Sequence, residues 1–325
     1  MKDNKIKKIF VAGHNGMVGS SLLRNLNVEN KNNKLIVKSK DELNLTNQQE
    51  VSNFLITEKP DEVYIAAAKV GGIYANSKYP AEFIYNNLMI STNLINLCFE
   101  NNIKKILFLG SSCIYPKFSQ QPIKEEYLLS GTLEETNEAY AISKIAGIKL
   151  CEAYNKQYFR SHDVDYRAVM PTNLYGIGDK YDDKNSHVIP ALIKRFHKAK
   201  IKNENNVKIW GSGNAKREFL FVDDLAIACI KVMNLTYNDY KSITENKGSF
   251  INVGSGSEVT IKELAETISE VVGYNGNLIF DTNMPDGTPR KLLDSNKIKN
   301  LGWKPKYNLL EGLKITYEDY LKNTW

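Results

Sequence analysis

The sequence lacks a long hydrophobic run. No stretch of about 18 consecutive apolar residues, the length that a membrane-spanning helix needs, occurs in the chain. The first residues, Met1–Lys8, are polar and lead directly into a predicted strand, so the apolar segment of a secretion signal is missing as well. We therefore expect a globular protein in the cytoplasm and no contact with a membrane.

Cysteine is scarce, and its spacing is uninformative for metal binding. The four residues Cys98, Cys113, Cys151 and Cys229 are scattered and show no metal-ligand spacing. A reducing compartment suits such a pattern, and we expect no metal site.

Excess charge of one sign is also small. The formal net charge is +6, and the lysines are spread along the chain without the clustered basic and aromatic pattern of a nucleic-acid surface. We expect no nucleic-acid partner, although a mild positive bias suits an anionic nucleotide substrate. Internal repeats and low-complexity linkers are absent from the sequence as well.

What the sequence does contain begins with a glycine-rich turn. The apolar segment Ile6–Ala12 predicts a strand, and Gly13, Gly16 and Gly19 follow it before a predicted helix. The first glycine allows a tight turn, the second lets the backbone approach a pyrophosphate, and the third lets helix and strand pack closely. This arrangement is typical of dinucleotide binding at a helix N-terminus.

The segment after the second predicted strand indicates which dinucleotide. Lys38 and Lys40 follow Leu35–Val37, where an NAD site usually has an acidic residue. Basic residues there favour the 2′-phosphate of NADP, although Asp41 and Glu42 come directly after them. Two exposed lysines at a strand end remain the alternative interpretation.

Strands and helices alternate in the first half of the chain, which predicts a Rossmann-type, doubly wound parallel α/β sheet. The predicted strands are Ile6–Ala12, Leu35–Val37, Glu62–Ala68, Lys105–Leu109 and Arg167–Met170; the helices are Ser20–Leu26, Ala81–Glu100 and Tyr140–Tyr158. The pattern then changes to a helix over Asn185–Lys198, a strand and turn over Val207–Gly213, a helix that Asp223 or Asp224 caps, a strand over Phe250–Val253 and a helix over Ile261–Val272. We expect Tyr237–Lys247 to be a surface loop and Pro285–Lys291 to be a turn.

The residues with the strongest chemical pattern are Ser111, Tyr140 and Lys144. Ser111 follows the fourth predicted strand, at the edge where open α/β sheets bind ligands. Tyr140 and Lys144 are four residues apart and share a helix face. An ammonium beside a phenol favours the phenolate, and a serine hydroxyl can hold a carbonyl oxygen, so the three together predict a carbonyl reductase.

The chain resembles the GDP-L-fucose synthase family of the extended short-chain dehydrogenase/reductase superfamily over nearly its whole length. The stretches that carry the resemblance are Ala12–Gly19, Ala66–Gly72, Leu109–Pro116, Gly131–Tyr154, Met170–Gly176, Asn185–Leu192, Trp210–Asp224 and Pro285–Leu293. It implies a Rossmann domain of residues 1–174 and 218–254, and a smaller α/β domain of residues 175–217 and 255–325 that binds the GDP-sugar. It also implies NADPH as cofactor, a homodimer, and conversion of GDP-4-keto-6-deoxy-D-mannose to GDP-L-fucose.

By this resemblance, Cys113 and His187 form the acid/base pair that epimerises carbons 3 and 5, while Tyr140, Lys144 and Ser111 serve the reduction. The chemistry agrees, because a 4-keto group acidifies the hydrogens on both carbons, and a thiol and an imidazole titrate near neutral pH. The implied cofactor residues are Gly13, Asn15, Gly16, Met17, Val18, Gly19, Lys40, Asn44, Leu45, Ala67, Leu109, Gly110, Ser112, Lys144, Pro171, Asn173, Leu174 and His187. The implied substrate residues are Ser112, Cys113, Asn173, Arg195, Trp210, Arg217, Asp286 and Lys291.

Three departures from the family pattern matter. The family commonly has arginine where Asn15 and Lys40 stand, so NADP preference is expected to be weaker. A longer connection, Ser161–Val164, precedes the fifth strand, and we expect it at the surface with no bearing on the chemistry.

Three alternative functions remain. The first is C4 reduction, with or without epimerisation, of a related GDP-4-keto sugar such as a heptose or a dideoxyhexose. The second is an NAD-retaining epimerase or dehydratase, against which Cys113 and His187 argue. The third is a nucleotide-sensing protein with an inactive Rossmann fold, against which an intact Ser111, Tyr140 and Lys144 argue.

Overall fold

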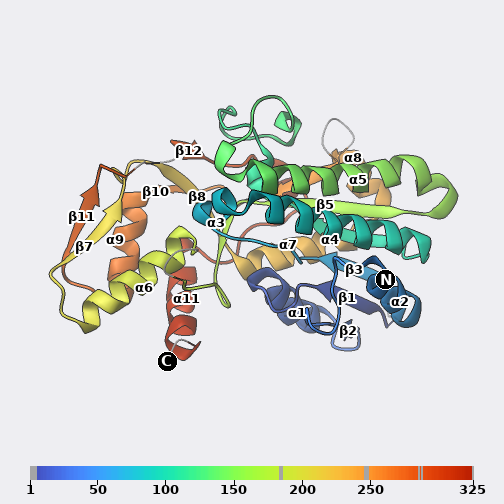
Figure 1. The fold of residues 1–325 in the computed structure, drawn as a ribbon, viewed down its shortest axis with the longest axis horizontal. Helices are drawn as coiled ribbons and strands as arrows, with labels where there is room; N and C mark the ends of the chain where they lie inside the picture. The colour runs from blue at the N-terminus through green and yellow to red at the C-terminus, as the bar shows by residue number, and fades with distance from the viewer. Residues whose placement is uncertain (1–5, 183–185, 245–248, 285, 287, 324–325) are drawn as a thin grey trace.

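The computed structural model describes residues 6–182, 186–244, 249–284, 286 and 288–323. Its largest sheet has six parallel strands in the order β2-β1-β3-β4-β5-β9 (Figure 1). The strands are β1 (Lys8–Ala12), β2 (Lys34–Ile36), β3 (Glu62–Ile65), β4 (Lys105–Leu109), β5 (Asp165–Pro171) and β9 (Phe250–Val253). The order reverses between β1 and β3, so the predicted doubly wound sheet is confirmed and its ligand-binding edge lies at this point.

Helices cover both faces of this sheet. On one face α4 packs against α5 and α2, and on the other α1 packs against α7 (Figure 1). These helices are α1 (Met17–Glu29), α2 (Gln48–Glu58), α4 (Pro80–Glu100), α5 (Glu138–His162) and α7 (Val222–Asn234). Helix α2 was not predicted from the sequence; its Asn47 cap accepts hydrogen bonds from the N–H groups of Gln49 and Glu50.

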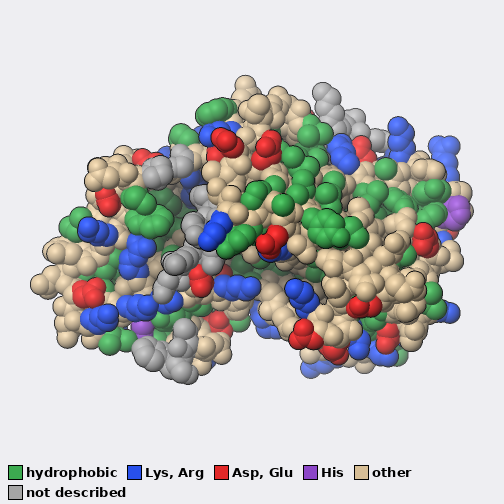
Figure 2. All heavy atoms as spheres, viewed as in Figure 1, with side chains coloured by type: hydrophobic (Ala, Val, Ile, Leu, Met, Phe, Trp, Pro, Cys, Tyr) green, Lys and Arg blue, Asp and Glu red, His purple; other side chains and the backbone are tan. Residues whose placement is uncertain are grey.

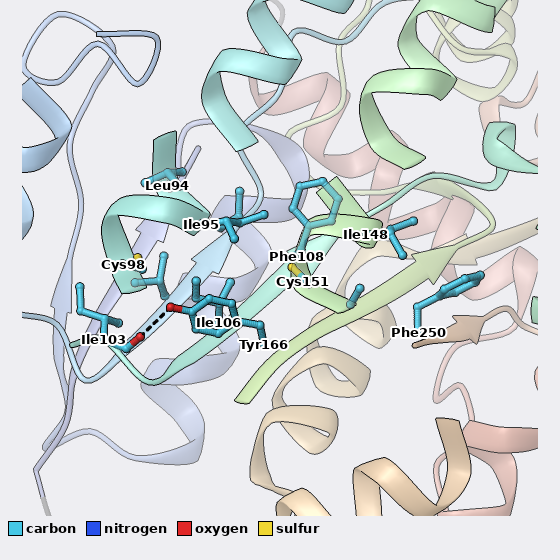
Figure 3. Close-up of a cluster of buried hydrophobic side chains, with 14 of the residues drawn as sticks. Leu94, Ile95, Cys98, Ile103, Ile106, Phe108, Ile148, Cys151, Tyr166 and Phe250 are labelled. Carbon is cyan, nitrogen blue, oxygen red and sulfur yellow. Dashed lines mark hydrogen bonds between the residues drawn. The ribbon is translucent and has the colours of Figure 1, made fainter. Parts of the chain in front are cut away.

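The core beneath α4 and α5 is continuous across the sheet (Figure 3). Phe108 of β4 lies among apolar side chains of both helices, and the Tyr166 hydroxyl donates to the Ile103 carbonyl oxygen at 3.0 Å. Cys98 and Cys151 are free, fully buried members of this core, where burial raises the pKa of both thiols. They therefore behave as small apolar residues and not as reactive thiols.

A second lobe lies at one end of the sheet and has its own core (Figure 1). In it β8 is flanked by β10 and β12 and also pairs with β6, while β7 pairs with β11. The strands are β6 (Asn173–Tyr175), β7 (Asn206–Trp210), β8 (Lys216–Phe221), β10 (Glu258–Thr260), β11 (Asn277–Asp281) and β12 (Arg290–Lys291). The remaining helices are α3 (Ile73–Lys78), α6 (Val188–Ile201), α8 (Tyr237–Thr244), α9 (Ile261–Val272), α10 (Asn296–Asn300) and α11 (Leu309–Asn323). Thr260 and Glu263 form a capping box that fixes the predicted start of α9.

The predicted surface loop at Tyr237–Lys247 is wrong over its first eight residues, which form α8. Tyr240 is 2% exposed, and its hydroxyl donates to the Ser249 carbonyl oxygen and accepts from the Ala168 N–H. These contacts anchor the segment on β5. Residues 245–247 lie outside the described residues, as does Asn185, where the following helix was predicted to begin.

The predicted aspartate cap of α7 is also wrong. The N-cap is Phe221, and no side chain caps the helix. Asp223 instead pairs with Arg24 of α1 at 2.6 Å, and Asp224 accepts hydrogen bonds from two backbone N–H groups, those of Lys306 and Tyr307. Both carboxylates thus hold α7 to other segments.

The predicted insert at Ser161–Val164 lies only partly at the surface. Ser161 and His162 extend α5 by its last turn, Asp163 ends it in the left-handed region at φ 53°, and Val164 is 1% exposed. The third strand ends at Ile65 and not at Ala68, which leaves Ala66 and Ala67 in the loop at the ligand-binding edge.

Among the described residues, no helix combines the length and apolarity of a membrane span. No cluster of three or more His, Cys, Asp or Glu side chains in the described ranges has an arrangement that could hold a metal ion.

Candidate active site

The glycine-rich turn forms a cradle that a side chain would fill. Gly13 has φ +87°, and a Cβ there would lie 2.6 Å from the backbone of Ala67. A Cβ on Gly19 would lie 2.1 Å from the Gly13 carbonyl oxygen, whereas one on Gly16 would have only that oxygen nearby, at 3.4 Å. Gly16 caps α1 without a side-chain hydrogen bond. The backbone there is therefore accessible to a diphosphate, and the turn fits the dinucleotide that its sequence predicts.

The basic segment after β2 is partly neutralised by its own turn. Glu42 accepts a hydrogen bond from the Ser39 N–H at 2.8 Å and lies 3.5 Å from the Lys38 ammonium. The Ser39 bond, followed by the Lys38 charge, lowers the pKa of Glu42, so this carboxylate is ionised at neutral pH. Lys40 is exposed and makes no ion pair within the part of the chain that is described. The role of Lys40 at a 2′-phosphate stays a prediction.

Two other predicted cofactor residues in this region have structural partners. The Asn44 side-chain oxygen accepts from the Thr46 hydroxyl at 2.8 Å, and the Leu45 carbonyl oxygen accepts from the Asn93 amide at 3.0 Å. These bonds fix the loop between β2 and α2 at the same edge of the sheet as the glycine-rich turn.

Ser111 and Cys113 lie directly beyond the end of β4. Gly110 permits this turn, because a Cβ there would lie 2.2 Å from the Met170 side chain. Ser111 caps the short 3-10 helix Ser112–Ile114, and its hydroxyl oxygen accepts from the Cys113 N–H at 3.5 Å. The predicted position of both residues at the carboxyl edge of the strand is confirmed.

Tyr140 and Lys144 reach the same edge from α5. Gly147 lets this helix approach β4, because a Cβ there would lie 2.3 Å from the Phe108 ring. Lys144 is 5% exposed and donates to the Leu109 carbonyl oxygen at 2.8 Å, with its ammonium 5.8 Å from the centre of the Tyr140 ring. Strand and helix therefore bring the predicted reductase residues together.

Burial sets the protonation of this group. It raises the pKa of Tyr140, an effect to which the Cys113 charge adds and which a hydrogen bond from Ser111 partly offsets. It lowers the pKa of Lys144 to about 8. The sequence predicts that the ammonium favours the phenolate; in the structure the largest influence on the pKa of Tyr140 is desolvation by burial, which favours the phenol. Tyr140 is therefore a phenol at neutral pH and can donate a proton.

Cys113 faces cations from both lobes. Burial raises the pKa of its thiol, while Lys291, a hydrogen bond from Ser111, and Lys144 lower it, in that order. Burial lowers the pKa of Lys291, which the Cys113 charge raises and the Arg217 charge lowers further. Lys291, one of the substrate residues that the family resemblance implies, is thus the cation with the largest effect on the pKa of the thiol.

His187 is the N-cap residue of α6 and is exposed. The protein around the imidazole ring nevertheless desolvates it. Desolvation lowers the pKa of the imidazole, which keeps the ring neutral at pH 7. No hydrogen bond joins His187 to Cys113 among the residues that the structure describes. The pairing of these two residues across a sugar ring therefore stays a prediction.

The remaining substrate candidates line the second lobe. Arg217 of β8 and Lys291 of β12 are neighbours in a parallel pairing, and the Asp286 carboxylate accepts from the Ser212 N–H at 2.6 Å. The Arg195 guanidinium lies 6.0 Å from the centre of the Trp210 ring, whose residue is 63% exposed. Figure 2 shows a notch between the lobes with lysine and arginine side chains beside it.

Asn173 and Glu218 complete the junction between the lobes. The Asn173 amide donates to the Glu218 carbonyl oxygen at 2.9 Å, so that amide nitrogen holds β6 beside β8. Glu218 itself is fully buried, and the sequence analysis did not single it out. Its signal in the sequence is a carboxylate that directly precedes the apolar segment Phe219–Val222.

Comparison with known proteins agrees with this geometry. Residues 9–248 match the NAD dependent epimerase/dehydratase family. GDP-L-fucose synthase of Escherichia coli (strain K12) is 54% identical over 317 residues, which cover 98% of this chain and 97% of that protein. Putative GDP-L-fucose synthase 2 of Arabidopsis thaliana is 55% identical over 319 residues, which cover 98% and 93%.

A solved structure is similar over the same length. It is MlghC, a GDP-mannoheptose C4 reductase from Campylobacter jejuni with NADP bound, which superimposes with a TM-score of 0.86 at 40% identity and covers 97% of this chain and 98% of that one. With relatives this similar over nearly their full length, the chain belongs to the NAD dependent epimerase/dehydratase family and, within it, to the GDP-L-fucose synthases.

Proposed function

We propose that the chain is an NADPH-dependent epimerase-reductase that converts GDP-4-keto-6-deoxy-D-mannose to GDP-L-fucose. The observation that carries the proposal is the convergence of Ser111, Cys113, Tyr140 and Lys144 at the carboxyl end of β4. A plain ketoreductase needs the serine, tyrosine and lysine, whereas the thiol beside them supplies an acid/base group for epimerisation. The bacterial and plant synthases that are 54% and 55% identical support the same substrate.

NADPH, when bound, supplies the hydride that reduces carbon 4. We assign its diphosphate to the turn at Gly13–Gly19, its 2′-phosphate to Lys40, and its nicotinamide ribose to Lys144. Ala67, Leu109 and Pro171 follow or end neighbouring parallel strands, so they lie along the same edge. The NADP-bound heptose reductase that is 40% identical supports this choice of cofactor.

In the reduction, Tyr140 gives its phenolic proton to the developing alkoxide while Ser111 holds the same oxygen. The raised pKa of Tyr140 keeps the phenol protonated until the alkoxide, a stronger base, forms beside it. Lys144 is held against the Leu109 carbonyl oxygen, which places its charge behind the tyrosine.

In the epimerisation, one of Cys113 and His187 removes a proton from carbon 3 or 5 and the other returns one to the opposite face. Burial raises the pKa of the Cys113 thiol, and the charges of Lys291 and Lys144 partly offset this, which limits the cost of forming the thiolate that removes a proton. The exposed imidazole of His187 can exchange its proton with water between the two inversions.

We also propose the domain division 1–174 with 218–254 and 175–217 with 255–325, a homodimer, and a cytoplasmic location. All six strands of the parallel sheet fall in the first domain and β7, β10, β11 and β12 in the second, which supports the division; its boundaries cross β6 and β8, which join the two lobes. Exposed Tyr85 of α4 and Ile142 of α5, at 61% and 41%, support an interface on these helices. Light scattering of the purified chain tests the homodimer.

A second candidate is C4 reduction, with or without epimerisation, of a related GDP-4-keto sugar such as a heptose or a dideoxyhexose. The similarity to a GDP-mannoheptose C4 reductase favours it, because hexose and heptose differ by one carbinol group. The deciding experiment incubates the protein with NADPH and each GDP-4-keto sugar and identifies products by NMR. GDP-L-fucose as the main product supports the proposal; faster turnover of a heptose, or retention of the starting configuration at carbons 3 and 5, replaces it with the second candidate.

A further inference from the structure

Glu218 is a fully buried carboxylate whose two oxygens bind different segments of the chain. One oxygen accepts from the Gly256 N–H at 2.7 Å, beyond the end of β9, and the other accepts from the Leu293 N–H at 3.0 Å, beyond β12. Its backbone carbonyl oxygen accepts from the side chains of Thr172 and Asn173 at 3.2 and 2.9 Å. One residue therefore joins the edge of the Rossmann sheet, the start of β6 and the chain after β12.

The segment after β12, which Glu218 binds through Leu293, contacts the loop that follows Cys113. Leu293 forms an isolated parallel bridge with Ile123, whose N–H donates to the Leu292 carbonyl oxygen at 2.7 Å. Ile123 ends the loop that follows the 3-10 helix Ser112–Ile114, which contains Cys113. Two residues before Leu293, Lys291 pairs in register with Arg217, the neighbour of Glu218 on β8. The carboxylate and the bridge thus attach the chain after Lys291 to the Rossmann lobe at the end of the loop that follows Cys113.

We propose that Glu218 is a positioning residue, which fixes Lys291 of the substrate lobe against Cys113 of the Rossmann lobe. The inference rests on the proposed function and adds a residue to it that touches neither substrate nor cofactor. The interaction of the Lys291 and Cys113 charges, each of which shifts the pKa of the other group, agrees with this placement.

The site requires a carboxylate of this length. Both partners are N–H donors, so each oxygen must accept, and the neutral amide of glutamine would turn an NH₂ group toward one of them. Space is limited as well, because a Cβ on Gly254 would lie 2.4 Å from the carboxylate. Glu218→Gln therefore releases one of the two segments without changing the volume of the side chain.

Asp224 offers a matched control. It is 1% exposed, and its carboxylate also accepts from two backbone N–H groups, those of Lys306 and Tyr307, at 2.8 and 3.1 Å. It holds the chain before α11 to α7, and its hydrogen bonds within the described residues go to Lys306 and Tyr307 and not to β12. Asp224→Asn thus removes the same kind of pairing from a different place.

The test is a double-mutant cycle between Glu218→Gln and Lys291→Met in the full-length protein. The first readout is the rate at which solvent deuterium enters carbons 3 and 5 of GDP-4-keto-6-deoxymannose, and the second is the Kd for GDP alone. If Glu218 acts through Lys291, each single change slows exchange about tenfold, and the double variant is no slower than Lys291→Met. Asp224→Asn combined with Lys291→Met gives the product of the two separate effects.

Multiplicative losses in the Glu218 cycle, about a hundredfold in the double variant, overturn the inference. NADPH affinity within twofold of wild type, and a cooperative thermal transition, show that each variant is folded; if Glu218→Gln fails this check, Glu218→Asp takes its place in the cycle. If the wild-type protein exchanges no deuterium, that result contradicts the proposed function instead. The double-mutant cycle measured on the Kd for GDP then still decides whether Glu218 and Lys291 are coupled.

Discussion

The residues of the candidate site on the Rossmann side are more buried than those named on the substrate-lobe side. On the Rossmann side, Lys144 is 5% exposed and is hydrogen-bonded to the end of β4, and Ser111 contacts both Cys113 and Tyr140. On the substrate-lobe side, Trp210 is 63% exposed, and His187 and Asp286 are exposed as well.

From this difference in burial we expect the buried residues to determine the reaction and the exposed residues to determine which substrate binds. Buried groups have pKa values shifted by desolvation, and their geometry is fixed before a ligand arrives, so they determine which reaction occurs. Exposed groups on strand ends and helix caps contribute contacts that can change without disturbing the reacting atoms. We therefore expect changes in the first half to lower kcat and changes in the second to raise KM.

The largest effect is expected for Tyr140→Phe, which removes the proton donor and keeps the ring. Reduction should fall in kcat by roughly 10²–10⁴-fold, the loss typical of a missing general acid. Epimerisation should continue, visible by NMR as solvent deuterium entering carbons 3 and 5. Reduction at the wild-type rate would remove Tyr140 from the mechanism and with it the contrast between the two halves.

Cys113→Ser tests whether the buried half performs two reactions. A hydroxyl is a much weaker acid than a thiol, so its basic form is scarce, and carbon-bound deuterium exchange should slow by on the order of 10²-fold. Hydride transfer continues, so the expected product is un-epimerised GDP-D-rhamnose. His187→Gln should stall exchange or inversion at a different centre. Fully epimerised product from Cys113→Ser at the normal rate would leave the thiol a packing role only.

The pH dependence of kcat/KM for NADPH tests the role of the Lys144 charge in the buried half of the site. With its pKa lowered to about 8, Lys144 is an ammonium below that pH and loses its charge above it. We expect kcat/KM for NADPH to be constant below pH 8 and to fall by up to about tenfold per pH unit above it. The profile is measured in Cys113→Ser, in which no thiol titrates at residue 113. A rate that stays level well into the alkaline range would show that the ammonium is dispensable.

Trp210→Ala probes the exposed half. The Arg195 guanidinium over the indole ring is worth about 1 kcal/mol at an exposed site, so KM for the GDP-sugar should rise about fivefold with kcat unchanged. Steady-state kinetics separate the two parameters. A fall in kcat of the same size would mean that this half also positions the reacting atoms.

The smallest effect is expected at the cofactor edge. Lys40 is exposed, and a surface cation contributes up to about 1 kcal/mol, so Lys40→Ala should narrow the preference for NADPH over NADH by about two- to fivefold. Wild type should still prefer NADPH, by a modest margin because Asn15 makes no ionic contact. Lys38→Ala serves as the control, since Lys38 lies beside Glu42. Equal kcat/KM for the two cofactors in wild type would contradict the assignment of Lys40.

Several features were predictable because they depend on near neighbours in the chain. The turn at Gly13 and the shared face of Tyr140 and Lys144 follow from local geometry alone, and so does the capping box that starts α9. The predicted loop at Tyr237–Lys247 failed for the opposite reason. Its polar composition hides one residue, Tyr240, whose hydroxyl is anchored on a strand about 70 residues earlier.

The sequence by itself determined the sheet type and the glycine-rich turn, and it placed Tyr140 and Lys144 on one helix face, because short-range periodicity and turn stereochemistry encode these features. Only the tertiary structure decided that burial sets the pKa of Tyr140, and that the charge of Lys291 lowers the pKa of Cys113. Glu218 likewise acquires its role from N–H groups 38 and 75 residues away. Desolvation and long-range hydrogen bonds depend on the packing of the whole chain, which no local pattern contains.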